Sequence, residues 1–277
     1  MDPSDMHKNS GYHFKLIPHS FDNHTWKIHQ TYRLKVAYTH NPSKFWIITK
    51  INKLDRFHKY LQFFYRNYGR GFVIAKCNLR WYKYGVVYVY ESYYRALLVT
   101  VPLEHEDKSV QAFLVDYGIS VEVPPANVYV LSDELLDVPQ FAIRATLSRM
   151  GPFNSPKWTS EATDIFRHMV KDMVLAGKVK RVDTVRRIVE LELDDYYCRA
   201  RCMSLVKNAL LAKQCAIPLT GFEKESELKF REPPFFEIEA GVDQDTECVK
   251  STLEKITLSY PEIPDMCPLS IKQIRML

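Results

Sequence analysis

The sequence predicts a protein of the α+β class, mainly β with added helices. Between residues 72 and 123, short runs rich in Val, Tyr and Phe follow one another closely. Their connections contain Gly, Glu-Ser or Glu-His-Glu-Asp, a pattern typical of a small antiparallel barrel. Residues 52–69 and 159–174 instead repeat apolar side chains at helical spacing. A length of 277 residues with 46% hydrophobic content allows one large or two small domains.

The N-terminal half predicts a strand pair followed by a helix. Residues 32–51 should form two strands, because Asn41-Pro42-Ser43 has the chemistry of a turn. Asn52 can cap the helix of residues 52–69, and Gly69 can end it. The apolar face of this helix consists of Leu54, Phe57, Leu61, Phe64, Tyr65 and Tyr68. The strands expected after it are Phe72–Cys77, Val86–Tyr90, Arg95–Val101, Val110–Val115 and Ser120–Val123.

The C-terminal half predicts further helices and strands. The segment SDELLDVP, residues 132–139, predicts a short helix closed by Pro139. A strand is expected in residues 141–150, a helix in 159–174 and a half-buried strand in 187–195. A last helix should span about residues 203–215 and stop before Pro218. After Gly221 the pattern weakens, and residues 221–277 are expected to be an acidic tail.

The charges and reactive side chains favour a binding protein without a metal. The net charge is +5, but residues 1–220 hold 31 basic against 21 acidic residues, so this part fits phosphate or an acidic partner. The six cysteines form no C-x-x-C pair, and five histidines between residues 7 and 29 follow neither a helical nor a strand period. Neither a metal nor a cofactor is therefore expected. No apolar run of about 18 residues and no signal peptide occur, which predicts a reduced intracellular protein that does not cross a membrane.

The tripeptide Asp116-Tyr117-Gly118 permits three interpretations: a turn, a metal-binding kinase motif, or a wall of an aromatic pocket. A kinase also needs a glycine-rich loop between strands and a His-Arg-Asp segment. The sequence has no His-Arg-Asp, and its only G-x-G follows a helix. No G-x-S-x-G, H-E-x-x-H or Walker loop is present either. The sequence therefore predicts that the protein is not an enzyme.

Two segments together carry a family resemblance. YVYESYYRALLV (88–99) places an aromatic before a short turn and Tyr-Arg-Ala, and VQAFLVDYGISVEV (110–123) ends a strand in Val-Asp-Tyr-Gly. This combination resembles the extended Tudor domain of germline small-RNA proteins. VAYTHNPSKFWI looks like the strand pair that opens the staphylococcal-nuclease-like part of this family, and VYVLSDELLDVPQFAIRATL looks like the segment after its core. The resemblance covers about residues 30–217.

The resemblance implies a five-stranded Tudor barrel at about residues 76–130, joined by a helix to a nuclease-like subdomain of the OB type. That subdomain would consist of residues 31–75 and 131–220, so that the extended Tudor domain spans 31–220. Residues 1–30 would be an N-terminal extension.

The resemblance also implies a cage for methylated arginine. A planar, weakly hydrated guanidinium stacks between aromatic faces. The walls of the cage fall on Tyr88, Tyr94, Leu114 and Tyr117, and its hydrogen-bonding position falls on Ile119. The family usually has a fourth aromatic where Leu114 stands and an asparagine where Ile119 stands. Arg95 and Asp116 should pair with each other and support the cage, while Gly118 makes the turn.

The function implied is a non-catalytic scaffold that docks the arginine-rich tail of a Piwi-type Argonaute protein in a cytoplasmic, perinuclear germ granule (nuage). Other Tudor proteins are further expected partners. Two alternatives stay open: RNA or single-stranded DNA binding through the OB-type part, and a structural scaffold with a degenerate cage.

Overall fold

The computed structural model describes residues 16–103, 108–196 and 205–219. The expected N-terminal extension lies outside this part up to residue 15, and so does the acidic tail of residues 221–277. The chain divides into two compact units. We call residues 16–18 and 52–140 the sheet unit, and residues 19–51 and 141–219 the barrel unit.

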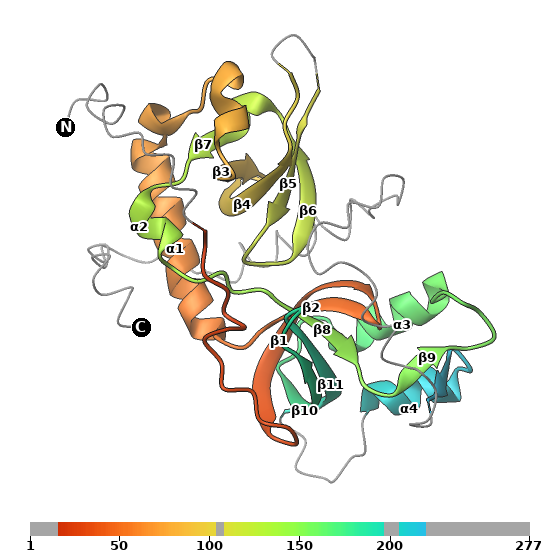
Figure 1. Ribbon diagram of the computed structural model, residues 1–277. Helices are drawn as coiled ribbons and strands as arrows, with labels where there is room; N and C mark the ends of the chain where they lie inside the picture. Colours follow the sequence, from red (N-terminus) through yellow and green to blue (C-terminus); the bar gives the residue numbers. More distant parts are fainter. Residues whose placement is uncertain (1–15, 104–107, 197–204, 220–277) are drawn as a thin grey trace. The chain divides into compact units, whose positions relative to one another are not determined.

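The sheet unit contains a five-stranded antiparallel sheet and a long helix (Figure 1). The strand order is β6-β5-β4-β3-β7. Its elements are α1 (Ile51–Tyr68), β3 (Tyr84–Val89), β4 (Ser92–Thr100), β5 (Val110–Leu114), β6 (Ile119–Val123), β7 (Val128–Val130) and α2 (Asp133–Leu136), with short 3₁₀ turns η2 (Gly69–Phe72), η3 (Lys76–Trp81) and η4 (Pro125–Asn127).

The barrel unit contains a closed five-stranded barrel in the order β1-β10-β11-β8-β2. This barrel is the OB-type subdomain of the predicted α+β fold. Its elements are β1 (Thr31–Asn41), β2 (Lys44–Ile48), β8 (Ile143–Leu147), β9 (Met150–Pro152), α3 (Ser160–Val170), β10 (Leu175–Asp183), β11 (Ile188–Asp195), α4 (Leu205–Ala212) and β12 (Ala216–Pro218). The pair β9–β12 forms a separate two-stranded sheet.

Several local predictions are confirmed. The turn between β1 and β2 is closed by the Ser43 backbone N–H, which donates to Asn41 Oδ1 over 2.8 Å. Helix α1 ends at Tyr68, directly before Gly69. Helix α2 is short and is followed by Pro139. Each of these features depends on residues that are close together in the sequence, so the sequence alone predicts it.

Other local predictions were wrong. Residues 72–77 do not form a strand: they lie in η2, a single bridge from Val73 to Tyr129, and η3. The fifth strand is instead β7, which pairs with Gly85–Val87 of β3. Residues 171–174 are not helical: α3 ends at Val170, Lys171 is extended, and Asp172 has a φ of 60° before the chain enters β10. Asn52 lies inside the first turn of α1 and does not precede it.

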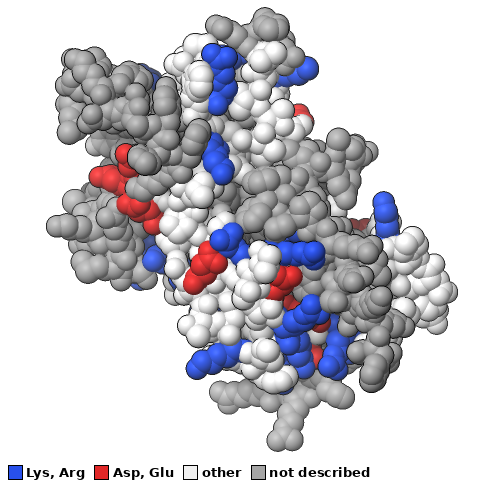
Figure 2. Space-filling view, viewed as in Figure 1, with Lys and Arg blue, Asp and Glu red and all other residues white. Residues whose placement is uncertain are grey.

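Each unit has its own core. In the sheet unit, α1 buries Leu54, Phe57, Leu61 and Tyr65, and β5 and β6 bury their alternate side chains. In the barrel unit, Phe45 and Phe166 pack with ring centroids 5.1 Å apart inside a large apolar cluster. Figure 2 shows basic and acidic side chains interspersed over the face drawn.

Candidate functional site

The hairpin of β3 and β4 sends its tyrosines to two different faces. Val87 pairs with Tyr94, and Tyr88 pairs with Tyr93. Because successive side chains of a strand point to opposite faces, Tyr94 and Tyr88 lie on opposite sides of the sheet. Tyr94 is buried, with 1% of its surface exposed. Tyr88 is only half-buried and packs on Tyr93, with ring centroids 4.8 Å apart.

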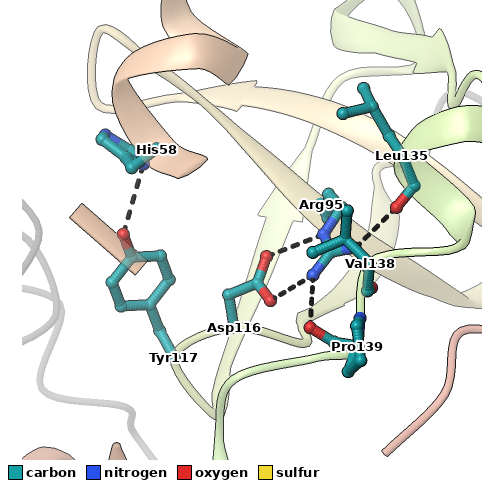
Figure 3. Close-up of polar contacts among 7 residues, drawn as sticks. All are labelled: His58, Arg95, Asp116, Tyr117, Leu135, Val138 and Pro139. Carbon is teal, nitrogen blue, oxygen red and sulfur yellow. Dashed lines mark hydrogen bonds and ion pairs between the residues drawn. The ribbon is translucent and has the colours of Figure 1, made fainter. Parts of the chain in front are cut away.

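Arg95 and Asp116 form a buried ion pair with two parallel contacts. Arg95 Nε donates to Asp116 Oδ2 over 2.9 Å, and one terminal nitrogen donates to Oδ1 over 2.6 Å. The same terminal nitrogen also donates to the carbonyl of Pro139. The other terminal nitrogen donates to the carbonyls of Leu135 and Val138 over 2.7 and 2.6 Å (Figure 3).

These contacts use all five N–H donors of the guanidinium. The Arg95 Cζ also lies 4.4 Å from the ring centroid of Phe57. The pair that the resemblance implied is thus present, and it joins β4, the turn after β5 and the segment around α2. Because every donor has an acceptor inside the protein, the pair acts as a structural anchor.

The turn after β5 positions Tyr117. The Tyr117 and Gly118 backbone N–H groups both donate to the Leu114 carbonyl, over 3.1 and 2.8 Å. Gly118 has a φ of 78°, a left-handed conformation that glycine adopts without strain. This turn directs the Tyr117 ring into the sheet unit, where 2% of the side chain is exposed.

Helix α1 contributes a histidine that the sequence analysis did not select. His58 is buried, and its Nδ1 lies 3.2 Å from the Tyr117 hydroxyl oxygen (Figure 3). Its ring centroid lies 5.4 Å from that of Tyr94 and 6.1 Å from that of Tyr117, and the two tyrosine centroids are 5.5 Å apart. His58 therefore completes a triangle of three packed rings.

Burial sets the charge of His58. Together with the smaller effect of nearby Arg66, it lowers the pKa of the imidazole from 6.5 to about 4. The ring is therefore neutral at neutral pH. A helical-wheel argument could have found it, because His58 lies one turn after Leu54 and one turn before Leu61, both on the buried face.

The remaining predicted cage residues are fully buried. Leu114 pairs with Ile119 across β5 and β6, and neither side chain is exposed. The structure thus brings Tyr94, Tyr117, Leu114 and Ile119 into the interior of the sheet unit, while Tyr88 lies on the other face. In this arrangement the Tyr94 and Tyr117 rings pack directly on each other, and the His58 ring of the same chain packs on both.

No group of three His, Cys, Asp or Glu side chains within residues 16–103, 108–196 and 205–219 could hold a metal ion. Cys77 is exposed and Cys215 is buried, and both are free thiols. In the same described ranges, no helix is long and apolar enough to span a membrane.

A comparison of the sequence with known proteins finds a match to one family model. Residues 27–149 match the family model of the Tudor domain. Tudor domain-containing protein 6 of Homo sapiens is 28% identical over 160 residues, which is 54% of this chain and 7% of that protein. The protein of the same name from Mus musculus matches to the same extent. The chain thus corresponds to a small fraction of the length of these relatives.

A comparison of structures finds the same fold. The third extended Tudor domain of mouse TDRD1, in complex with a MILI peptide that contains dimethylarginine, gives a TM-score of 0.60 at 20% identity, covering 71% of this chain and 97% of that one. The human TDRD1 extended Tudor domain, in complex with a symmetrically dimethylated peptide, gives 0.57 at 21%, with coverages of 79% and 98%. A Drosophila melanogaster Papi extended Tudor domain, in complex with a Piwi N-terminal peptide, gives 0.56 at 18%, with coverages of 69% and 100%.

Proposed function

We propose that the chain is a non-catalytic scaffold that binds an arginine-containing peptide of a partner protein, because residues 27–149 match the Tudor model and the fold is similar to that of extended Tudor domains. The observation that supports this proposal is the ring pair of Tyr94 and Tyr117, held nearly perpendicular with centroids 5.5 Å apart. Such a pair offers faces on which a guanidinium gains cation–π attraction.

In our proposal, His58 occupies the place of the ligand in the unbound protein. A neutral imidazole is a planar, delocalised ring, and it packs on both tyrosines. A guanidinium is also planar and delocalised, and it carries the charge that the imidazole lacks. Peptide binding then requires His58 to move away from the two tyrosine rings, and the loss of its contacts lowers the apparent affinity.

The other walls favour methylated arginine without selecting its isomer. Leu114 and Ile119 are apolar and buried, so methyl groups gain contact with them. Neither side chain can accept a hydrogen bond from the guanidinium. We therefore propose that dimethylated arginine binds more tightly than unmodified arginine, and that the symmetric and asymmetric forms bind alike.

The partner we propose is the arginine-rich tail of a Piwi-type protein. Two structures with this fold hold MILI or Piwi peptides, which supports this choice. Docking of such a tail, and of other Tudor proteins, would place the chain in germline small-RNA silencing. The setting would be cytoplasmic, in a perinuclear germ granule.

Calorimetric titration of the full chain tests the proposal. The ligand is one Arg-Gly-repeat peptide in unmodified, symmetrically dimethylated and asymmetrically dimethylated forms. We expect both dimethylated forms to bind with similar Kd values, and the unmodified form to bind more weakly. A Tyr117→Leu variant should bind none of them tightly. The absence of heat with every peptide would overturn the arginine-binding role and leave a structural scaffold.

A further inference from the structure

The segment from α1 to the end of η3 is unusually basic and aromatic. Residues 52–83 contain eight Lys or Arg, a single acidic residue, Asp55, and nine Phe, Tyr or Trp. In the rest of the chain, 30 basic residues stand against 32 acidic ones. The positive charge of the protein is therefore concentrated in this segment, of which the proposed arginine site uses only His58.

One stripe of α1 carries the charge. Arg56, Lys59, Phe63 and Arg66 follow one another at intervals of three, four and three residues, so they lie on the same side of the helix. Arg56 and Arg66 are exposed, and 42% of the Phe63 side chain is exposed between them. A large exposed aromatic side chain flanked by arginines marks a binding surface, because burying it against a partner is favourable.

A second stripe of α1, next to the first, is aromatic. Tyr60, Phe64 and Tyr68 follow one another at intervals of four residues, with ring centroids 6.2 and 5.6 Å apart. Tyr68, at the end of the helix, is 56% exposed. Arg70 follows in η2 and is exposed. The α1 outer surface, defined as Arg56, Tyr60, Phe63, Arg66, Tyr68 and Arg70, thus combines cations with exposed ring faces.

The 3₁₀ turn η3, which follows this surface in the chain, also combines an arginine with an exposed aromatic ring. In η3, the Arg80 Cζ lies 4.7 Å from the ring centroid of Trp81, and Trp81 is 53% exposed. On one side, Glu134 of α2 raises the pKa of the Tyr60 hydroxyl together with burial, the larger cause. The sequence from Phe63 to Arg70 contains no acidic residue, so this part of the surface favours an anion.

We propose that the α1 outer surface binds single-stranded nucleic acid. Its arginines would contact phosphates, and Phe63 and Tyr68 would stack on unpaired bases. The arginine-rich peptide of the proposed function does not fit here, because like charges repel. An acidic protein segment would satisfy the arginines, but it would leave the exposed ring faces without planar partners. This surface also differs from the OB-type barrel through which the sequence suggested RNA binding.

The test is fluorescence anisotropy with a labelled oligouridine of about 20 nucleotides and the full chain, at about 50 to 200 mM salt. We expect affinity to fall steeply with salt. Arg66→Gln with Arg70→Gln should lower the magnitude of the logarithmic salt slope by about 1.4, because each phosphate contact contributes about 0.7 on a single strand. Phe63→Ser with Tyr68→Ser should weaken binding about fivefold or more and leave the slope unchanged.

The controls are matched substitutions in the barrel unit. Lys213→Gln and Phe153→Ser change exposed side chains there and should alter neither affinity nor slope. Circular dichroism should show that every variant is folded. Equal loss of binding in the control variants would overturn the proposal, and so would equal competition by a polyglutamate peptide of the same length. Because oligouridine binding does not involve Tyr94 or Tyr117, failure here is distinct from failure of the arginine-binding proposal.

Discussion

The imidazole of His58 and the phenol of Tyr117 are joined inside the sheet unit, with Nδ1 and the hydroxyl oxygen 3.2 Å apart. Both side chains are at least 97% buried. The contact joins the middle of α1 to the turn that follows β5, so the helix closes the space in which the two tyrosine rings meet. This contact determines what the proposed arginine site requires before it can bind.

Removal of the His58 ring should open this space. In a His58→Ala variant, an arginine side chain can reach Tyr94 and Tyr117 without displacing a side chain. We expect calorimetry with a dimethylated Arg-Gly peptide to show about tenfold tighter binding than with the unchanged protein, equivalent to one or two cation–π contacts. The matched control is His24→Ala, which removes a half-buried histidine of the barrel unit. Unchanged or weaker binding by His58→Ala would contradict the occupied-site hypothesis.

The two faces of the hairpin make different predictions for two tyrosines. Tyr117→Leu should weaken peptide binding at least about tenfold, because it removes one of the two ring faces. Tyr88→Leu should change the Kd less than about twofold, because Tyr88 packs on Tyr93 on the other face. The titration already described measures both. An equal loss in the two variants would show that the ligand reaches Tyr88 and that the site extends over both faces.

The Arg95–Asp116 pair should stabilise the fold strongly. In Arg95→Met, the carboxylate of Asp116 and three backbone carbonyls lose their hydrogen bonds from Arg95. We expect the free energy of unfolding to fall by about 3–5 kcal/mol, measured by urea denaturation. The matched control is Arg167→Met, which breaks the exposed contact with Asp164 and should cost at most about 1 kcal/mol. A similar decrease in the free energy of unfolding in the two variants would show that burial does not make the Arg95–Asp116 pair more stabilising than an exposed pair.

The sequence predicts those parts of the fold that short-range signals determine. The Asx turn at Asn41, the end of α1 before Gly69 and the glycine turn at Gly118 each depend on residues close together in the chain. The error at residues 72–77 has a different origin. Val73 and Ile74 favour a strand by their side chains, but the edge of β3 pairs with Val128–Val130, which lie some 40 residues later in the chain. Tertiary packing decides which segment pairs with the edge strand, and the strand propensity of the residues does not predict this choice.

The candidate site was predictable to a similar extent. The tyrosine at each motif position followed from the sequence, but the hairpin register did not, and the register sends Tyr88 and Tyr94 to opposite faces. One residue more or less in the turn at Tyr90-Glu91 would bring Tyr88 and Tyr94 to the same face. The contact of His58 with both tyrosine rings depends on how α1 lies on the sheet, and no local pattern specifies that packing.

The neutral state of His58 predicts a pH dependence of stability. Its folded pKa of about 4 lies below the ordinary value of 6.5, so the unfolded chain takes up a proton first as the pH falls. The contribution of His58 to stability is therefore fully present above about pH 6.5. It is lost as the pH falls toward 4, and the loss is on the order of 3 kcal/mol.

Urea denaturation at a series of pH values should reveal this loss as a difference between the unchanged protein and a His58→Gln variant, which cannot titrate at this position. The comparison is needed because burial and Arg187 also lower the pKa of His19 to about 4, so both proteins lose stability in acid. Only the unchanged protein should show the additional loss from His58. Parallel pH profiles would mean that the imidazole takes up a proton in the folded state as readily as in the unfolded chain. That would require water to reach the space between Tyr94 and Tyr117, so the same result would show that the arginine site is open without any displacement of His58.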